Sequence, residues 1–355
     1  MKKYGSAKRI LPIFMILLSV GSIAGCSLSS SDNAVSESRE ERVCDFYLAT
    51  DEEAKDSPNI YLITKARNNV YWDSLIAGAV EGADSDGVNL YVGGITRESY
   101  VDDLRDLIHE AGDNKADAVI VSPQNTTDII REINRLKEIG IPVIFVDSLL
   151  NETDFDICYM TDNMHAGSLA AKGILDSLRR EGRGEEEELL VGIEVGSLQS
   201  QTIMERMAGF NGYWSKNAPG SWRIIENISC NDGDAAKAKQ DADDYMDEYP
   251  NLAVLVGLNN GSTVGIANSV MDRARTDIVV VGFDYSDEIA AMIDDTRYNA
   301  TTIVQRQYSM GMESVKEAGE LIKGEKPEYK FVDTGVVLVS KDNVDDISVQ
   351  KILTQ

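Results

Sequence analysis

Two carboxylate side chains follow two apolar runs of nearly the same build, and they lead the polar chemistry that this sequence offers. The run Ile141-Pro-Val-Ile-Phe-Val ends in Asp147, and the run Ile278-Val-Val-Val-Gly-Phe ends in Asp284. A short β-branched run without polar alternation predicts a strand that is covered on both faces, as in the middle of a parallel sheet. Open α/β sheets bind ligands at the carboxyl ends of such strands. The repeated pattern therefore predicts two lobes, each directing a carboxylate into one cleft.

Further polar and aromatic side chains follow other predicted strands. Asn69, Tyr71 and Trp72 come after the apolar run at 60–64. An amide that both donates and accepts, beside flat apolar rings, matches the hydroxyl rim and C–H faces of a sugar. The alternative is a turn whose aromatic rings fill the core. Other candidates near predicted strand ends or helix starts are Arg206, Asn259 and Gln305. Acids, amides and a guanidinium at one edge are suited to hydrogen bonding a polyol.

Signatures of catalysis are missing from the sequence. It contains no GxSxG nucleophile elbow, no GxxxxGK[ST] phosphate loop and no GxGxxG after a strand. Its two histidines are His109, in a predicted helix, and His165, which follows a predicted helix cap at Asp162 or Asn163. The absence of a CxxC pair argues against a thiol-bound metal. We therefore expect a protein that is not an enzyme and that has no catalytic residues, metal or cofactor.

The elements that must position the candidate residues alternate between strand and helix from Asn59 onward. Strands are predicted at 60–64, 88–92, 118–121, 143–146, 157–160, 189–194, 223–228, 253–256, 278–283, 300–304 and 335–339. Helices are predicted at 71–84, 100–111, 127–139, 165–180, 202–215, 235–249, 263–273, 288–294 and 308–323. This alternation predicts parallel sheets with right-handed crossovers. The number of strands suits two sheets, and 355 residues suit two domains.

The N-terminus has the pattern of a targeting segment. Four basic residues within the first nine positions precede an apolar stretch at 10–23, which is short for a transmembrane helix. The stretch ends in Ile23-Ala-Gly-Cys26, which resembles the lipobox of bacterial lipoproteins. We expect residues 1–25 to be a signal peptide, Cys26 to be lipidated and residues 26–57 to be a tether. The alternative is an uncleaved anchor with a chance cysteine.

Charge and cysteine content limit the partners and the covalent framework. The net charge of −26 argues against binding to nucleic acid or to anionic lipid headgroups, although it also suits any soluble protein surface. If Cys26 carries lipid, the three remaining cysteines are Cys44, Cys158 and Cys230, an odd number that argues against a complete disulfide framework. The segment 43–50 is more apolar than a tether should be, and its role stays open at this level.

From about Asn59 to Val344 the chain resembles the periplasmic sugar-binding proteins of the ribose-binding type, the type I solute-binding proteins of ATP-driven (ABC) importers. The matching phrases, in order, are IYLITKARNNVYW, IPVIFVDS, YMTDNMHAG, MERMAGF, VLVGLNNGSTVG, VVVGFDYSDE and TTIVQ. The resemblance implies an α/β fold of two Rossmann-like lobes, each a parallel sheet flanked by helices, joined by a three-strand hinge. The crossing strands would lie near 161–163, 305–306 and 333–335. The N-terminal lobe would comprise 58–161 plus 306–333, and the C-terminal lobe 162–305 plus 334–355.

The resemblance also implies a set of sugar contacts, and the chain departs from the family pattern at three places. The implied contacts are Asn69, Tyr71, Trp72, Asp147, Arg206, Asn259, Asp284 and Gln305. The chain has Ser148 where the ribose-type pattern has arginine, it has Lys65 where a small hydroxyl residue is usual, and it lacks an aromatic residue at 230–234. We expect Lys65 to supply the missing positive charge beside the two acids. The alternative is that Lys65 points to solvent or pairs with an acid outside the cleft.

These features predict a lipid-anchored extracytoplasmic receptor at the cell membrane. It would bind a monosaccharide, a neutral pentose or hexose, between the lobes and deliver it to an ABC permease. The same receptor could instead report the sugar to a membrane histidine kinase or chemoreceptor. A sugar-responsive repressor of this fold would need a helix-turn-helix and a basic face, whereas this N-terminus has the pattern of a signal peptide and the chain is acidic. An extracellular enzyme on this fold would need a set of catalytic residues, and the signatures of such a set are missing from the sequence.

Overall fold

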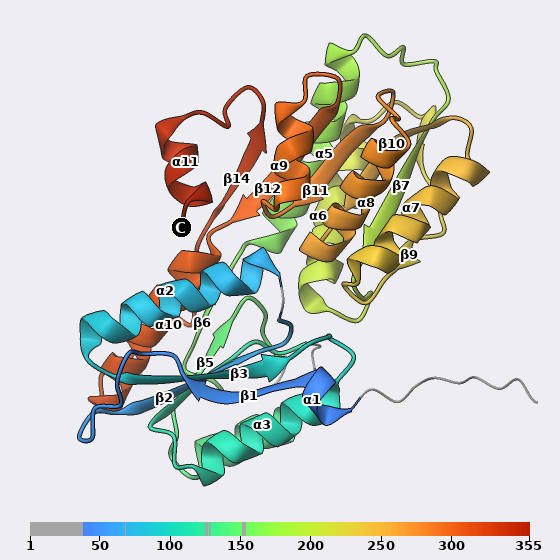
Figure 1. The fold of residues 1–355 in the computed structure, drawn as a ribbon. Coiled ribbons are helices and arrows are strands. Elements are labelled where there is room, and N and C mark those ends of the chain that lie inside the picture. Colours follow the sequence, from blue (N-terminus) through green and yellow to red (C-terminus); the bar gives the residue numbers. More distant parts are fainter. Residues whose placement is uncertain (1–37, 68, 125–126, 128, 151–153) are drawn as a thin grey trace, which may run out of the picture. The chain divides into compact units, whose positions relative to one another are not determined.

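Two sheets, each of seven strands, organise the chain from residue 38 onward (Figure 1). The computed structural model describes residues 38–355 apart from 68, 125, 126, 128 and 151–153. Within this part the chain passes from one sheet to the other at three places: after residue 160, after residue 305 and between residues 333 and 336. The expected α/β architecture, with two helix-flanked sheets joined by three crossings, is confirmed.

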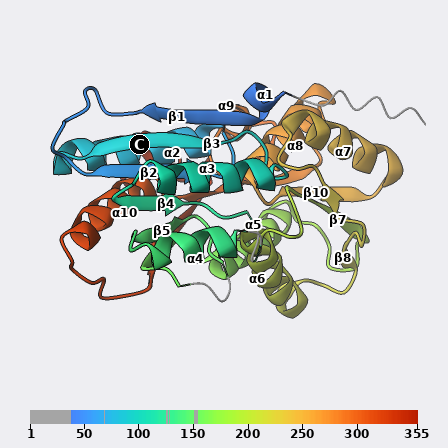
Figure 2. The same ribbon diagram turned by 90° about the horizontal axis from the view of Figure 1, so that it is seen from below.

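The first sheet has the strand order β1-β3-β2-β4-β5-β6-β13. Its strands are β1 (Val43–Leu48), β2 (Asn59–Thr64), β3 (Asn89–Ile95), β4 (Ala118–Val121), β5 (Val143–Val146), β6 (Ile157–Met160) and β13 (Phe331–Asp333). Helices α3 (Val101–Asp113) and α4 (Ile130–Glu138) pack on one face, the face nearer the viewer in Figure 2. Helices α2 (Val70–Asp86) and α10 (Gln307–Ile322) pack on the other. Both faces are covered, which explains why the central strands read as continuous apolar runs.

The second sheet has the order β14-β12-β11-β10-β7-β8, and β9 also pairs with β7. Its strands are β7 (Leu189–Val195), β8 (Trp222–Ile224), β9 (Ser229–Cys230), β10 (Leu252–Gly257), β11 (Val279–Phe283), β12 (Asn299–Gln305) and β14 (Val336–Ser340). Helices α5 (Asn163–Arg180) and α6 (Gln201–Asn217) cover one face. The other face is covered by α7 (Ala235–Glu248), α8 (Asn260–Asp272), α9 (Asp287–Asp294) and α11 (Ile347–Leu353).

The pairing is parallel except at one edge strand of each sheet. β1 runs antiparallel to β3, and β14 runs antiparallel to β12. Strand direction at an edge depends on how the chain arrives there, and the βα alternation does not encode it. The expectation of wholly parallel sheets is therefore wrong at these two strands.

The segment expected to be a tether belongs partly to the first sheet. The folded unit begins at Ser38, and α1 (Arg39–Arg42) leads directly into β1. Val43 is buried, and the strand pairs with β3 from Val43↔Ile95 to Leu48↔Tyr91. The tether boundary at residue 57 is thus placed too late, because one short edge strand among polar residues has a weak local signal. The expected signal peptide and Cys26 lie outside the described residues.

Close helix packing holds two site-bearing helices against their neighbours. A Cβ at Gly167 of α5 would overlap the carbonyl oxygen of Arg206 in α6, and a Cβ at Gly209 of α6 would overlap that of Met164. Glycine lets the two backbones approach to contact, so α6 is fixed on α5 where it presents Arg206. A Cβ at Gly78 of α2 would likewise overlap a backbone carbonyl of α10.

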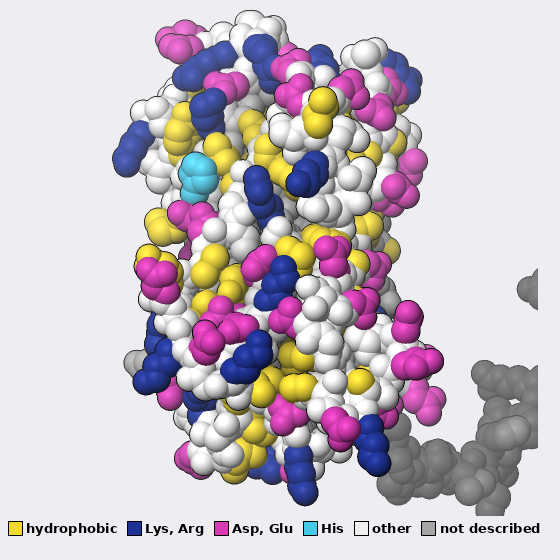
Figure 3. All heavy atoms as spheres, turned by 90° about the vertical axis from the view of Figure 1, so that its left-hand side faces the viewer, with side chains coloured by type: hydrophobic (Ala, Val, Ile, Leu, Met, Phe, Trp, Pro, Cys, Tyr) yellow, Lys and Arg dark blue, Asp and Glu magenta, His cyan; other side chains and the backbone are white. Residues whose placement is uncertain are grey.

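Three further observations concern the described part as a whole. None of its helices combines the length and the apolarity needed to cross a membrane. Cys44, Cys158 and Cys230 are free thiols. On the face drawn in Figure 3, Asp and Glu side chains are interspersed with Lys and Arg, and no broad basic area appears there.

Candidate functional site

A cavity of about 530 Å³ lies where the carboxyl ends of the two sheets face each other. Its volume falls within the range of roughly 300–1,000 Å³ that is usual for small-molecule sites. Every residue that the sequence singled out for ligand binding lines this cavity. They are Lys65, Asn69, Tyr71, Trp72, Asp147, Arg206, Asn259, Asp284 and Gln305. The shared edge of parallel strands brings these residues together from positions far apart in the chain.

Asp147 and Asp284 occupy equivalent positions in the two sheets. Each follows the last residue of its strand, β5 or β11, and each has a left-handed backbone, with φ of 66° and 67°. The amide of Asp147 donates to Tyr159 O at 2.9 Å, and that of Asp284 donates to Ile303 O at 2.8 Å. This conformation is unfavourable for residues other than glycine and is concentrated at functional sites. In both lobes it turns the chain sharply at the strand end, where the carboxylate lines the cavity.

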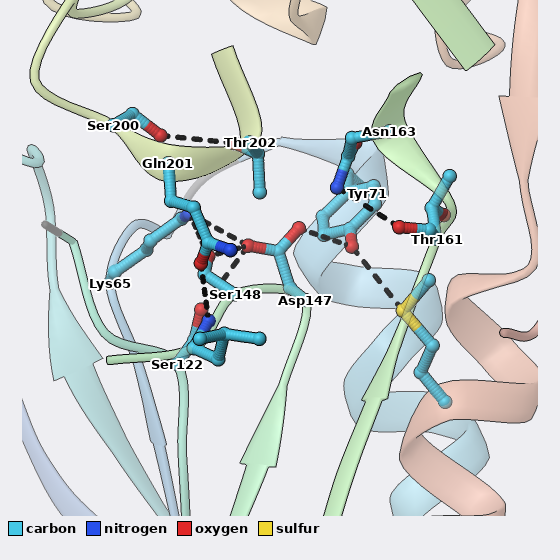
Figure 4. Close-up of polar contacts among 12 residues, drawn as sticks. Lys65, Tyr71, Ser122, Asp147, Ser148, Thr161, Asn163, Ser200, Gln201 and Thr202 are labelled. Atoms are coloured by element: carbon cyan, nitrogen blue, oxygen red, sulfur yellow. Dashed lines mark hydrogen bonds and ion pairs between the residues drawn. The ribbon is translucent and has the colours of Figure 1, made fainter. Parts of the chain in front are cut away.

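Asp147 is the centre of a saturated network in the first lobe (Figure 4). Its Oδ2 lies 2.7 Å from Lys65 Nζ and accepts from Ser148 Oγ at 2.6 Å. Its Oδ1 accepts from Tyr71 OH at 2.6 Å. Lys65 Nζ also donates to Ser148 Oγ at 2.5 Å. Ser122 Oγ lies 3.3 Å from Oδ2 as a further donor.

These contacts determine the ionisation of Asp147. Burial favours its neutral form, but the adjacent Lys65 ammonium and the hydroxyl donors outweigh burial and hold the pKa of Asp147 below its usual value. Lys65 is 3% exposed, so it does not point to solvent. The structure places Lys65 in the cavity wall as the counter-charge of Asp147, as the departure from the family pattern indicated.

Asp284 is held less completely in the second lobe. Its Oδ1 accepts from Gln305 Nε2 at 2.9 Å, and Oδ2 has no hydrogen-bond partner among the residues that the structure describes. Burial raises the pKa of Asp284 to about 6, with Arg206 and Gln305 opposing the shift and Asp147 adding to it. Asp284 therefore has an oxygen available to accept hydrogen bonds from a ligand.

Gln305 couples Asp284 to the only arginine among the predicted site residues. Its Oε1 accepts from Arg206 Nη2 at 3.0 Å and from Thr161 Oγ1 at 2.9 Å. Arg206 also donates to Leu258 O at 2.7 Å and to Asn163 Oδ1 at 2.9 Å. Thr161 and Gln305 lie at two of the crossings between the sheets, so this network connects the site to the hinge.

The aromatic residues of α2 serve both the cavity and the core. Trp72 is 4% exposed, and its ring meets the Tyr71 ring edge to face, with centroids 4.9 Å apart. Asn69 precedes the helix, and its Oδ1 accepts from Trp72 N at 3.2 Å, which caps α2. These side chains therefore pack in the core and also line the cavity.

Several polar residues of the cavity wall were missed by the sequence reasoning. They are Glu98, Asp232, Asp234, Asn260, Ser286 and Glu288. Each follows a strand end within a few residues, and that position was the available signal. Two contacts cross the cleft at this wall: Ser99 Oγ donates to Asp232 Oδ2 at 2.7 Å, and Arg97 Nη2 lies 3.4 Å from Asp234 Oδ2. The two lobes are thus in direct contact on one side of the cavity.

Comparison with known proteins agrees with this architecture. The sequence profile described as periplasmic binding protein domain matches residues 60–326. The ribose import binding protein of Bacillus subtilis is 23% identical over 269 residues, which are 75% of this chain and 82% of that protein.

Solved structures show the same fold. A carbohydrate transporter solute binding protein from Agrobacterium radiobacter, in complex with D-arabinose, superposes with a TM-score of 0.80 at 24% identity, covering 84% of this chain and all of that one. The XylFII–LytSN complex contains a chain that superposes with a TM-score of 0.71 at 25% identity, covering 81% of this chain and 99% of that one.

Proposed function

The chain belongs to the periplasmic binding protein domain family, and from this premise we propose that it is an extracytoplasmic receptor for a neutral sugar. The observation that carries the proposal is the buried Asp284 carboxylate, which has an oxygen free toward a cavity that Trp72 and Asn69 also line. A carboxylate oxygen accepts from adjacent hydroxyls, an amide donates and accepts, and an aromatic face covers C–H groups. Together these groups fit a monosaccharide ring, a pentose or a hexose.

The charges of the site support a ligand without net charge. Lys65 and Asp147 form one ion pair, and Arg206 lies close enough to Asp284 to oppose the rise in its pKa. These two acids are therefore balanced by two bases before any ligand enters. The rest of the cavity wall carries more acids (Glu98, Asp232, Asp234 and Glu288) than bases (Arg67 and Arg97). A sugar acid or a sugar phosphate would add an uncompensated negative charge at a buried site, which is costly.

Delivery to an ABC permease is the role that the sequence relatives support, because the Bacillus protein is a ribose import binding protein. A second role, as the sugar-sensing partner of a membrane histidine kinase or chemoreceptor, is supported by the similarity to a chain of the XylFII–LytSN complex. Deleting the gene and measuring uptake of the bound sugar distinguishes the two. Lost uptake supports the importer role, and normal uptake with a lost transcriptional response supports the sensor role.

Anchoring by lipid at Cys26 belongs to the same proposal. The sequence Ile23-Ala-Gly-Cys26 supports it, and residue 26 lies outside the described part of the chain. Cells fed labelled fatty acid should label the wild-type protein in the membrane fraction and should leave Cys26→Ala unlabelled. Equal labelling of both proteins would contradict the anchor.

The binding function is tested by a thermal-shift screen with pentoses, hexoses, a sugar acid and a sugar phosphate. A ligand that binds only the folded protein stabilises it by RT ln(1 + [L]/Kd), which is about 2.7 kcal/mol at a hundredfold excess over Kd. We expect a shift with at least one neutral sugar and none with the charged sugars. Chromatography of the same mixtures should recover the sugar unchanged, since the protein is proposed to bind and not to transform it. A product peak would contradict that.

A further inference from the structure

A second pair of polar side chains lines the same cavity and takes no part in the contacts described above. Asn260 is the first residue of α8, and Ser286 is the residue before α9. The two strands that lead to them, β10 and β11, pair in parallel, so their carboxyl ends lie side by side. Asn260 and Ser286 therefore lie near each other, just beyond the carboxyl ends of two central strands of the second sheet. Both residues line the cavity.

Both side chains are buried and incompletely hydrogen bonded. Asn260 is 7% exposed and Ser286 is 5% exposed. Among the residues that the structure describes, Asn260 Nδ2 and Ser286 Oγ have no hydrogen-bond partner. Buried polar atoms in native proteins nearly always have partners, so each exception requires an explanation. Both residues line the cavity, and a turn of each side chain toward it would let a bound molecule complete both groups.

Ser286 does not use its hydroxyl to cap the helix that it precedes. A serine that precedes a helix ordinarily accepts a hydrogen bond from a backbone amide of the first turn. Ser286 makes no such bond in α9. Its hydroxyl is therefore not needed to cap the helix, and it can donate to a ligand or accept from one.

We propose that Asn260 and Ser286 form a second subsite for a further hydroxylated sugar unit, so that the ligand is a disaccharide. This inference rests on the proposed sugar-binding function and extends it. The first unit occupies the subsite of Asp284 and Arg206, and the second lies against Asn260 and Ser286.

The chemistry of the surrounding wall matches a neutral polyol at this subsite. The amide of Asn260 donates a hydrogen bond, the hydroxyl of Ser286 donates or accepts one, and the carboxylate of Glu288 accepts one. A sugar with several hydroxyl groups can satisfy all three side chains. Val264 adds apolar surface to the same wall. An anionic group is disfavoured because Glu288 and Asp234 also line the cavity.

The size of the cavity agrees with a ligand longer than one ring. The volume of about 530 Å³ lies well inside the range of roughly 300–1,000 Å³ that holds small molecules up to drug size. A second ring beside the first is compatible with a cavity of this size.

The test is titration calorimetry on the purified full chain. The probes are four monosaccharides (ribose, xylose, glucose and galactose) and four disaccharides (xylobiose, cellobiose, maltose and lactose). We expect at least one disaccharide to bind about tenfold more tightly than its own monosaccharide. Ser286→Ala and Asn260→Ala should each lower the ratio of disaccharide to monosaccharide affinity about fivefold, the value of one lost hydrogen bond.

A matched control is Ser200→Ala. Ser200 is also a buried serine that precedes a helix without capping it, but it bonds to Thr202 Oγ1 at 2.9 Å and does not line the cavity. This variant should keep the wild-type affinity ratio. Ser286→Ala should not lower the melting temperature, because the hydroxyl that it removes has no partner among the described residues.

The outcomes separate this inference from the function on which it rests. If monosaccharides bind as tightly as every disaccharide, and the two variants leave the ratio unchanged, the second subsite is overturned and the sugar receptor stands. If no sugar of the panel binds the wild-type protein, both are overturned.

Discussion

The ammonium nitrogen of Lys65 lies 2.7 Å from Oδ2 of Asp147, and 4% and 7% of the two side chains are exposed. This buried ion pair joins the end of β2 to the end of β5, two strands that are separated by β4 in the first sheet. Removing one member of such a pair leaves the other as an uncompensated buried charge. The pair therefore couples the stability of the first lobe to the electrostatics of the cavity.

Replacing Lys65 by methionine should destabilise the protein strongly at neutral pH. The expected loss is roughly 3–5 kcal/mol in the free energy of unfolding, measured by urea denaturation at pH 7. Because the pKa of Asp147 is lowered in the folded wild type, its stabilising contribution is present above the unfolded value of about 3.9 and is lost as the pH falls through the folded value. The difference in unfolding free energy between the wild type and Lys65→Met should accordingly be smaller at pH 3.5 than at pH 7.

The control for this measurement is Lys172→Met, which removes one member of an exposed ion pair with Asp176 on α5. Pairs of that kind contribute about 0.3–0.5 kcal/mol. If Lys65→Met lowers the free energy of unfolding no more than Lys172→Met does, the buried ion pair does not stabilise the first lobe as proposed.

Moving the positive charge to the neighbouring position should restore part of what Lys65→Ser loses. Ser148 Oγ lies within hydrogen-bond distance of both Lys65 and Asp147, so an arginine at 148 begins beside the same carboxylate. We expect Lys65→Ser to abolish tight sugar binding and the double variant Lys65→Ser/Ser148→Arg to recover it partly, with a changed sugar preference. The change in preference follows because a guanidinium fork differs from an ammonium point charge. Calorimetry showing native affinity for Lys65→Ser would refute this.

Replacing Asp284 by asparagine should stabilise the ligand-free protein while it weakens binding. The folded pKa of Asp284 is raised from 3.8 to about 6, so between these values the folded state binds more protons than the unfolded state, and stability falls as the pH rises. Above pH 6 the full cost is present, about 3 kcal/mol for a shift of about two units. Compared with the wild type, Asp284→Asn should therefore have a free energy of unfolding that is higher by up to that amount at pH 7.5 and only slightly higher at pH 4.

The same variant should bind the sugar at least about 100-fold more weakly, because charge-assisted hydrogen bonds contribute about 1.5–3 kcal/mol each. In the wild type, the affinity should fall as the pH drops below about 6, where the carboxylate becomes protonated. Titration calorimetry at pH 7.5 and pH 5 checks both expectations. An affinity that is insensitive to pH and to the substitution would remove Asp284 from the site.

Replacing Gly209 by alanine should disturb the site from a distance. Its new Cβ would overlap the carbonyl oxygen of Met164, so α6 must move away from α5 and carry Arg206 with it. Overpacking of this kind costs about 1–3 kcal/mol. We expect a lower melting temperature together with weaker sugar binding.

Gly212→Ala is the matched control on the same helix, since a Cβ there meets no atom within 4 Å. It should leave binding unchanged and raise stability by up to about 1 kcal/mol through helix propensity. Equal effects of the two substitutions would show that the contact between α5 and α6 does not position Arg206.

Trp72 should report ligand binding by fluorescence. It lines the cavity, whereas the other two tryptophans, Trp214 and Trp222, lie in the core of the second lobe. A sugar that stacks on the Trp72 ring changes its surroundings, so wild-type protein should show a saturable change in emission. Trp72→Phe should lose most of this emission change. If the variant keeps the whole change, a residue other than Trp72 is responsible for it.

Much of the fold was predictable because the signals that encode it are local. Strands β4, β5 and β6 have the bounds that the apolar runs predicted, and the alternation with helices indicated parallel sheets. The candidate site was predictable for a related reason. In parallel sheets every carboxyl strand end lies at one edge, so polar residues such as Asp147 and Asp284 had to converge there.

What the tertiary structure alone decided is which partner each group meets. The sequence placed Lys65 and Asp147 at two strand ends, but only the strand order brings Nζ to 2.7 Å from Oδ2, and only the packing leaves Asn260 Nδ2 and Ser286 Oγ without partners among the described residues. The same holds for β1, which joins the first sheet through pairing with β3. Hydrogen bonds, ion pairs and edge pairing depend on distances between residues that are remote in sequence, and those distances are set by the strand order within each sheet and by the packing around it.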